Sequence, residues 1–240
     1  MKIAIDGRAL LGERTGIGTY TRGIAAGLAG RLGIEVGLFS PRPLGNGGGP
    51  WSVHAGSHPV GMLWVQTTLD RRARDWGADA LLAALTIGPV HGSVPLVSIV
   101  HDLTPWTHPQ WHAARTLAGF ALLWEKTVDR ASRLICVSHA TAAELLRRYP
   151  ETAPRVRVVA NGVDPEFSPE TDPAALEETR RRHAGGRPFI LYLGTLEPRK
   201  NVGALLSACE LLWESGRPLP DLVLAGGAGW KSFPLARAIA

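Results

Sequence analysis

The sequence predicts an α/β protein built from parallel sheets that are wound on both faces with helices. Three observations lead to this prediction: short apolar runs alternate with helical patterns, turns rich in Gly and Pro separate them, and the alternation restarts after a polar segment. Apolar residues make up 45% and charged residues 20% of the 240 positions, as in ordinary globular proteins. The length allows one large domain or two smaller ones.

The predicted strands are short apolar runs of the kind that parallel sheets bury on both faces. In chain order they are residues 2–5, 35–39, 80–84, 96–100, 133–137, 156–159, 189–193 and 221–225. Helical periodicity is present in residues 17–32, 62–76, 110–131, 140–148 and 202–213. Residues 41–50, with a Gly-Asn-Gly-Gly-Gly core, are predicted as a loop, and Ser138 as the N-cap of the helix that follows it.

A polar seam divides the chain into two predicted domains. Residues 165–173 are rich in Pro and acidic side chains, and the strand pattern restarts at Phe189. We therefore expect an N-terminal domain at 1–164, an inter-domain linker at 165–185 and a second α/β domain at 186–240. Two strands and a helix cannot cover both faces of a sheet. The second domain is therefore expected to be incomplete, short of a normal domain by on the order of 100 residues.

Charge and cysteine content narrow the function classes. The net charge of +5 and the isoelectric point near 9.7 favour anionic partners such as phosphorylated donors or anionic lipid. Nucleic acid is not expected, because the basic residues are scattered without zinc-finger or RNA-binding signatures. Cys136 and Cys209 lie in apolar contexts and are predicted as buried thiols, which fits a reducing cytoplasm. No apolar run reaches the ~18 residues of a spanning helix, and the N-terminus is strand-like, so a cytoplasmic protein is expected.

The most informative stretch is residues 189–201, FILYLGTLEPRKN. An apolar strand is followed by Gly194, which permits a sharp turn, and the loop ends in Arg199 and Lys200 just before a helix. Arginine can bind a diphosphate through two hydrogen bonds, lysine adds a point charge, and free N–H groups at a helix start favour anions. The stretch predicts a diphosphate site, and a solvated basic turn is the alternative.

Two further segments have candidate ligand-binding residues at the end of a predicted strand or at the start of a predicted helix. Gly16 and Gly18 open the helix at 17–32, where backbone N–H groups can approach an anion, although they could also form a plain helix-opening turn. A dinucleotide fingerprint fits poorly, because residues 7–15 separate these glycines from the strand and position 21 is Thr. His101 follows a strand at the sheet edge where α/β proteins bind ligands; a histidine bonded to local backbone is the alternative.

Five stretches together resemble the retaining glycosyltransferases of family 4, which have the GT-B fold. They occur in the family's order and cover most of the chain: TGIGTY at 15–20, VHDL at 100–103, VSHATAAEL at 137–145, ANGVD at 160–164 and LGTLEPRKN at 193–201. The resemblance implies a Rossmann-like, doubly wound acceptor-side domain, followed by the first part of a second Rossmann-like domain that binds a nucleotide sugar.

The resemblance also implies a reaction and its residues. A sugar such as mannose would pass from a nucleoside-diphosphate sugar to a hydroxyl of a saccharide or lipid-linked saccharide, with retention, in polysaccharide or glycolipid biosynthesis. The catalytic residues would be His101, Arg199 and Lys200. The donor would be bound by Gly16, Gly18, Gly194, Arg199, Lys200 and Gly227. No metal and no other cofactor is expected, and the sequence has no Asp-x-Asp pair of the kind that holds a divalent ion at a diphosphate.

The sequence departs from the family pattern in one respect. It ends before the family's Glu-x7-Glu element, so we expect the 240-residue piece alone to be inactive or nearly so. A catalytically dead nucleotide-sugar-binding remnant is therefore an alternative, and a phosphorylase or epimerase on the same fold is a third.

A peripheral contact with the inner face of the membrane is also considered. Arg71, Arg72 and Arg74, with Leu69 and Trp76, could form a basic amphipathic helix on anionic lipid. The alternative is an ordinary surface helix.

Overall fold

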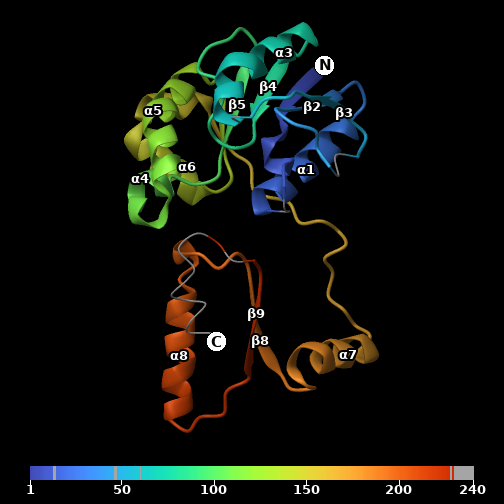
Figure 1. Cartoon of the computed structure of the whole chain (residues 1–240), viewed down its shortest axis with the longest axis vertical. Coiled ribbons are helices and arrows are strands. Elements are labelled where there is room, and N and C mark those ends of the chain that lie inside the picture. The colour runs from blue at the N-terminus through green and yellow to red at the C-terminus, as the bar shows by residue number, and fades with distance from the viewer. Residues whose placement is uncertain (13–14, 46–47, 60, 228, 230–240) are drawn as a thin grey trace. The chain divides into compact units, whose positions relative to one another are not determined.

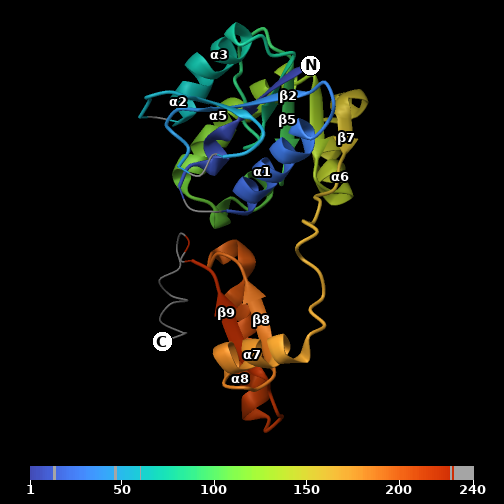
Figure 2. The same cartoon turned by 90° about the vertical axis from the view of Figure 1, so that its right-hand side faces the viewer.

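The computed structural model describes residues 1–12, 15–45, 48–59, 61–227 and 229. It divides the chain into two compact units, Met1–Asp164 and Pro165–Ala240. Parts of the loop predicted at 41–50 and of the glycine-rich turn at 226–229 lie outside the described residues. Figures 1 and 2 show the elements of each unit.

The first unit is built on one seven-stranded sheet in which every neighbouring pair of strands is parallel. The strand order is β3-β2-β1-β4-β5-β6-β7, which reverses direction between β1 and β4. Such a reversal is the switch point of a doubly wound sheet, and ligands bind beside it at the carboxyl ends of the strands. The strands are β1 Lys2–Asp6, β2 Glu35–Ser40, β3 Ser52–Ala55, β4 Ala80–Ala83, β5 Leu96–Val100, β6 Arg133–Cys136 and β7 Val156–Val158.

Helices pack on both faces of this sheet (Figure 2). They are α1 Gly16–Ala29, α2 Gly61–Trp64, α3 Asp70–Asp75, α4 Thr104–Thr107, α5 Ala114–Arg130 and α6 His139–Arg148. A π-helical turn, Val65–Leu69, joins α2 to α3, and short 3-10 turns lie at Gly7–Leu10, Pro109–Trp111 and Pro150–Arg155. The predicted N-cap is confirmed, because the Ser138 hydroxyl accepts a hydrogen bond of 3.1 Å from the Thr141 N–H.

Alternate residues of each strand point to opposite faces of the sheet and pack into two apolar cores, one on each face. Ile3 and Ile5 of β1 contribute to the core that includes Ala25 of α1, whereas Ala4 belongs to the core on the other face. That second core holds large aromatic side chains from the remaining helices, chiefly Trp64, Phe120 and Trp124. Burial on both faces explains why these strands were predicted from apolar runs alone.

The structure also corrects several sequence-based predictions. Strand β3 was not predicted, because it is an edge strand with Ser52 and Val53 exposed and no apolar run. Helix α5 begins at Ala114, since Pro109–Trp111 forms a separate 3-10 turn. Cys136 is fully buried, and burial raises its pKa to about 11. Cys209 is partly exposed, so its prediction as a buried thiol was wrong.

The helix run from α2 to α3 does not present an apolar face to solvent. Leu69 is completely buried, and Trp76 packs against the core and against the ring of Phe39. The apolar side of this segment therefore faces inward, and its interpretation as a membrane-surface helix is not supported. None of the helices in the described part of the chain combines the length and apolar character needed to cross a membrane.

The second unit contains α7 Pro173–Ala184, β8 Phe189–Leu193, α8 Val202–Glu214 and β9 Asp221–Ala225. Its two strands form a parallel pair. As expected for so small a sheet, large apolar side chains stay uncovered: Leu193 is 78% exposed and Trp213 of α8 is 79% exposed.

Helix α7 lies inside the stretch that was predicted as a linker. Asp172 caps its start by accepting a hydrogen bond of 3.0 Å from the Ala174 N–H, and Gly185, with φ of 57°, ends it. Its side chains are charged around most of the helix, with Glu–Arg pairs three residues apart. Periodicity could not reveal a helix that has no apolar stripe.

Candidate functional site

The loop after β8 begins with Gly194 and ends at the start of α8. The Tyr192 hydroxyl donates a hydrogen bond of 3.0 Å to the Thr195 carbonyl, which braces the loop. Pro198–Lys200 forms a 3-10 turn, and Asn201 then takes the left-handed conformation with φ of 49°. The side chain of Asn201 does not cap α8, so it leaves the first N–H groups of that helix to other partners.

The two predicted phosphate ligands differ in their surroundings. The Arg199 guanidinium lies 2.7 Å from the Glu197 carboxylate, and only 4% of Glu197 is exposed. Glu197 is thus a buried ion-pair partner and not a solvated loop acid. Its Oε1 is close enough for an ion pair but makes no well-aligned hydrogen bond in the described chain. Lys200 is exposed, and its ammonium pairs with no carboxylate among the described residues.

The pKa of Tyr192 is affected by the same surroundings as Glu197 and Arg199. Its pKa is raised, first by loss of solvent and then by the negative charge of Glu197, which disfavours a phenolate. The phenol therefore stays protonated at neutral pH and keeps its hydrogen bond to the loop.

A second loop, after β9, is bonded to the first. The Gly194 N–H donates to the Ala225 carbonyl at 2.9 Å, and the Leu196 N–H donates to the Gly227 carbonyl at 3.0 Å. Gly226, with φ of 151°, approaches so closely that a Cβ there would lie 2.0 Å from the Gly194 oxygen. No atom of the described residues lies within 4 Å of a Cβ built on Gly227, and a contact between Gly227 and a nucleotide stays a prediction.

In the first unit, His101 follows β5 at the carboxyl edge of the sheet. One ring nitrogen, Nε2, lies 2.9 Å from the Ala84 carbonyl. A carbonyl can only accept, so this nitrogen carries the hydrogen and Nδ1 of the neutral ring is an acceptor. The Tyr20 ring meets His101 edge to face, with centroids 5.0 Å apart. The backbone therefore satisfies one nitrogen of His101, and no hydrogen bond to the other is found among the described residues.

The two glycines that open α1 have different roles. The Thr15 hydroxyl accepts a hydrogen bond of 3.1 Å from the Gly18 N–H, which is therefore already used. A Cβ at position 18 would lie 2.6 Å from the Ala9 carbonyl oxygen, so Gly18 is needed for packing. Among the described residues, no atom lies within 4 Å of a Cβ built on Gly16, and anion approach at Gly16 remains a prediction.

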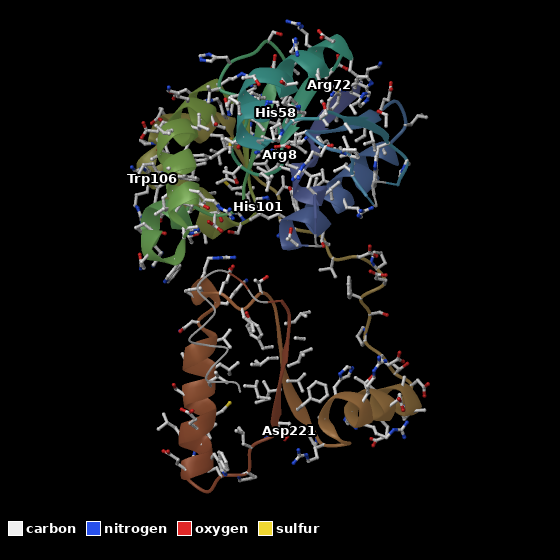
Figure 3. All side chains as sticks on the ribbon, viewed as in Figure 1. Arg8, His58, Arg72, His101, Trp106 and Asp221 are labelled. Carbon is white, nitrogen blue, oxygen red and sulfur yellow. The ribbon has the colours of Figure 1, made fainter. Side chains whose placement is uncertain are left out.

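Sequence reasoning missed an ion pair beside the switch point. Asp6 is fully buried and holds Arg8 through Nε at 3.0 Å and Nη2 at 2.7 Å. Arg8 Nη2 also lies 3.4 Å from the Ile87 carbonyl and so joins the segments that follow β1 and β4. Two charged residues directly after a buried strand were the available signal. Figure 3 shows Arg8 and His101 within the unit.

A strained residue lies in the same region. Thr86, in the loop after β4, has φ of 70°, which is unusual for a β-branched side chain. Its carbonyl accepts a hydrogen bond of 2.6 Å from the Ser98 hydroxyl, which holds the conformation. Strain of this kind concentrates at ligand sites.

The predicted site residues therefore form two groups, one in each unit. Gly16, Gly18 and His101 lie at the carboxyl edge of the seven-stranded sheet, and Gly194, Arg199, Lys200 and Gly227 lie at the carboxyl edge of β8 and β9. The profile of Glycosyltransferase Family 4 matches residues 14–167, more than half of the chain. The chain belongs to Glycosyltransferase Family 4.

The chain is similar in sequence to two mannosyltransferases of Escherichia coli. The chain is 27% identical over 135 residues to the O-antigen chain mannosyltransferase B of Escherichia coli, covering 56% of this chain and 35% of the relative. It is 29% identical over 142 residues to the Escherichia coli serotype-specific mannosyltransferase WbdA, covering 55% and 17%. The chain thus spans about a third or less of the length of these relatives.

Solved structures confirm the fold. Anabaena HepE, solved in complex with UDP and glucose, superposes with a TM-score of 0.66 at 20% identity, over 98% of this chain and 63% of HepE. WaaG, a glycosyltransferase involved in lipopolysaccharide biosynthesis, superposes with a TM-score of 0.66 at 17% identity, over 98% and 66%. The predicted α/β fold of GT-B type is therefore confirmed.

Proposed function

We propose that the protein transfers a sugar from a nucleoside-diphosphate donor to an acceptor hydroxyl, with retention of anomeric configuration. The observation that carries this proposal is the placement of Arg199 and Lys200 at the carboxyl end of β8, before the uncapped start of α8. Family membership supports the reaction class. The bound UDP and glucose of HepE support a nucleotide-sugar donor, and the O-antigen relatives support mannose and a saccharide or lipid-linked saccharide acceptor.

In the proposed reaction, the acceptor hydroxyl oxygen bonds to the anomeric carbon as the bond between that carbon and the diphosphate oxygen breaks. The hydroxyl proton passes to the departing nucleoside diphosphate, on which negative charge grows. Arg199 and Lys200 stabilise that charge. Glu197 contacts one guanidinium nitrogen of Arg199. A guanidinium carries five N–H donors in a planar fork that matches phosphate oxygens, so Arg199 is proposed to bind the diphosphate through this group. Glu197 is thus a positioning residue. These two cations supply the charge that a divalent ion would supply elsewhere, so the proposal includes no metal.

The first unit is proposed to bind the acceptor and to contact a hydroxyl of the transferred sugar. Nδ1 of His101 is an acceptor and suits a hydrogen bond from a sugar hydroxyl. Its position beside the switch point is where doubly wound sheets bind ligands. The acceptor is proposed to bind near Gly16 and His101.

A transfer assay tests the proposal. GDP-mannose, UDP-glucose and ADP-glucose, each labelled in the sugar, are incubated with the protein and a mannose-terminated oligosaccharide, and the product anomer is assigned by NMR. We expect transfer from one donor with retention by a protein that joins this chain to a Glu-x7-Glu element, and little or no transfer by the 240-residue chain alone. The variants below are therefore compared in the longer protein. Lys200→Ala should lower kcat/KM by about 10²–10³-fold, whereas the exposed Lys126→Ala control should not. Inversion of the anomer, or undiminished transfer by Lys200→Ala, would contradict the proposal.

A further inference from the structure

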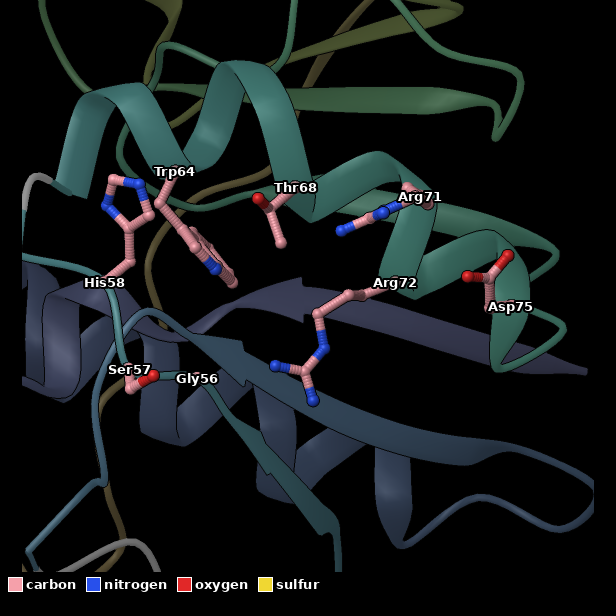
Figure 4. A pocket seen from close by; sticks show the side chains of 8 residues that line it. All are labelled: Gly56, Ser57, His58, Trp64, Thr68, Arg71, Arg72 and Asp75. Carbon is pink, nitrogen blue, oxygen red and sulfur yellow. The ribbon is translucent and has the colours of Figure 1, made fainter.

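The first unit contains a pocket of about 420 Å³ whose lining includes neither the glycines of α1 nor His101. It lies between the segment after β3 and the helix run α2–α3 (Figure 4). Its volume is within the ~300–1,000 Å³ of ligand-binding clefts. The residues that line it are Gly56, Ser57, His58, Trp64, Thr68, Arg71, Arg72 and Asp75.

Two buried or half-buried donors converge on this pocket. Trp64 is 1% exposed and lines the pocket, and its indole nitrogen is not among the buried polar atoms that lack a partner in the part of the chain that the structure describes. Figure 4 shows that the indole and the Arg72 guanidinium extend toward each other. A Cβ built on Gly56 would lie 3.4 Å from Trp64 Nε1 and 3.3 Å from Arg72 Nη1, so both nitrogens face the space that the glycine leaves open.

The indole N–H of Trp64 can serve as one donor to a ligand in the pocket. Arg72 is anchored, because Nη1 donates to the Ala55 carbonyl at 3.1 Å. Its remaining N–H groups are held in a fixed orientation, which favours recognition of an oxyanion.

The charge of the pocket is positive. Arg71 is exposed and makes no ion pair with any described residue. The one acid in the lining, Asp75, is already paired with Arg74 at 2.9 Å. Indole and guanidinium groups only donate, and the hydroxyls of Ser57 and Thr68 can also donate. A cation would find few acceptors here, whereas an anion would find several donors.

We propose that this pocket binds a phosphate group carried by a small organic molecule or a lipid headgroup. Two guanidinium groups and a neutral N–H donor suit the several oxygens of a phosphate. The pocket has room for an ester substituent beside the phosphate. The site lies entirely within the first unit and does not depend on Arg199 or Lys200.

The test uses the 240-residue chain labelled with 15N at its tryptophan side chains. The indole signal of Trp64 is identified by its loss in Trp64→Phe. Inorganic phosphate and glycerol 3-phosphate are titrated at constant ionic strength, balanced with chloride. We expect a saturable shift of the Trp64 indole signal, and the same shift in Lys200→Ala, which separates this site from the proposed donor site.

Matched variants test the assignment. Arg71→Glu reverses an exposed charge without breaking a bond in the described structure, and Arg72→Ala removes the fixed donor. Each should weaken phosphate binding about tenfold or more. Arg31→Ala, which removes an exposed charge elsewhere in the unit, should leave binding unchanged. Circular dichroism checks whether Arg72→Ala is folded. If Arg72→Ala is unfolded, Arg71→Glu alone tests the proposal.

A vesicle-binding experiment distinguishes a lipid headgroup from a free phosphate ester as the ligand. Co-sedimentation is measured with phosphatidylcholine vesicles with and without phosphatidylglycerol. Binding only to the anionic vesicles, weakened by Arg71→Glu and not by Arg31→Ala, assigns the site to a lipid headgroup. Saturable binding of glycerol 3-phosphate without vesicle binding assigns it to a free phosphate ester. The proposal is overturned if none of the probes binds, or if Arg71→Glu and Arg31→Ala bind equally well.

Discussion

Among single residues, Gly18 and Gly16 form a natural pair, because both lie in the first turn of α1. A Cβ at position 18 would meet the Ala9 oxygen at 2.6 Å, whereas nothing lies within 4 Å of a Cβ at position 16. Gly18→Ala should therefore lower the free energy of unfolding by about 1–3 kcal/mol. Gly16→Ala should leave it unchanged or raise it by up to ~1 kcal/mol. Urea unfolding measures both, and equal effects would refute the packing argument.

His54 gives the residue-scale pH prediction. Burial, followed by the positive charge of Arg72, lowers its pKa from the ordinary 6.5. The unfolded chain therefore takes up a proton before the folded one as pH falls, so the free energy of unfolding decreases below about pH 7. The loss levels off once pH is below the lowered native pKa. His54→Gln should flatten this part of the stability curve, and parallel curves for the two proteins would count against it.

The residues of the site show what sequence reasoning can supply. Arg199, Lys200 and His101 were predicted as site residues because they follow apolar strands, and the ends of such strands can be predicted from a sequence. Their roles stay predictions. The pairing of Arg199 with buried Glu197 was not predicted, because it depends on how the loop folds back. Gly18 was expected to face a ligand, but its packing on Ala9 is a tertiary contact across a loop.

Between elements, the Asp70–Arg130 pair joins α3 to α5. Their side chains meet at 2.5 Å, and Asp70 also accepts a hydrogen bond of 3.0 Å from the Ser93 N–H. Gly92, with φ of 146°, leaves room for the carboxylate, because a Cβ there would lie 2.0 Å from Asp70 Cγ. The pair thus fixes the loop before β5 against two helices.

Asp70→Ala should lower the free energy of unfolding by about 3–5 kcal/mol, because it leaves the Arg130 charge half-buried without its partner. Asp75→Ala, on the same helix but exposed, should change it by no more than ~1 kcal/mol. Thermal and urea denaturation measure the difference. A similar loss in both variants would show that the Asp70 pair does not hold these elements together.

Elements were predictable where burial imposed a pattern. Strands of the seven-stranded sheet are covered on both faces, so their apolar runs stood out. Strand β3 at the sheet edge and the charged helix α7 have no such pattern. Their stability comes from neighbours and caps, which periodicity does not register.

For the whole molecule, the division at Asp164 makes a prediction about proteolysis. Phe167 is 70% exposed and lies in a stretch without helix or strand, before α7. Chymotrypsin should cut there early under native conditions, because cleavage requires locally extended chain. The N-terminal fragment should keep its helical circular dichroism. Initial cleavage within the seven-stranded unit, detected by mass spectrometry, would be inconsistent with two separate units.

The central claim, that Arg199 and Lys200 bind the donor diphosphate, is tested most directly by calorimetric titration of GDP, UDP and ADP into the protein. We predict binding of at least one of them, weakened by salt and reduced about tenfold or more in Lys200→Ala. The Lys126→Ala control should bind like the wild type. Equal affinity of Lys200→Ala and the wild-type protein for that nucleotide would contradict the claim.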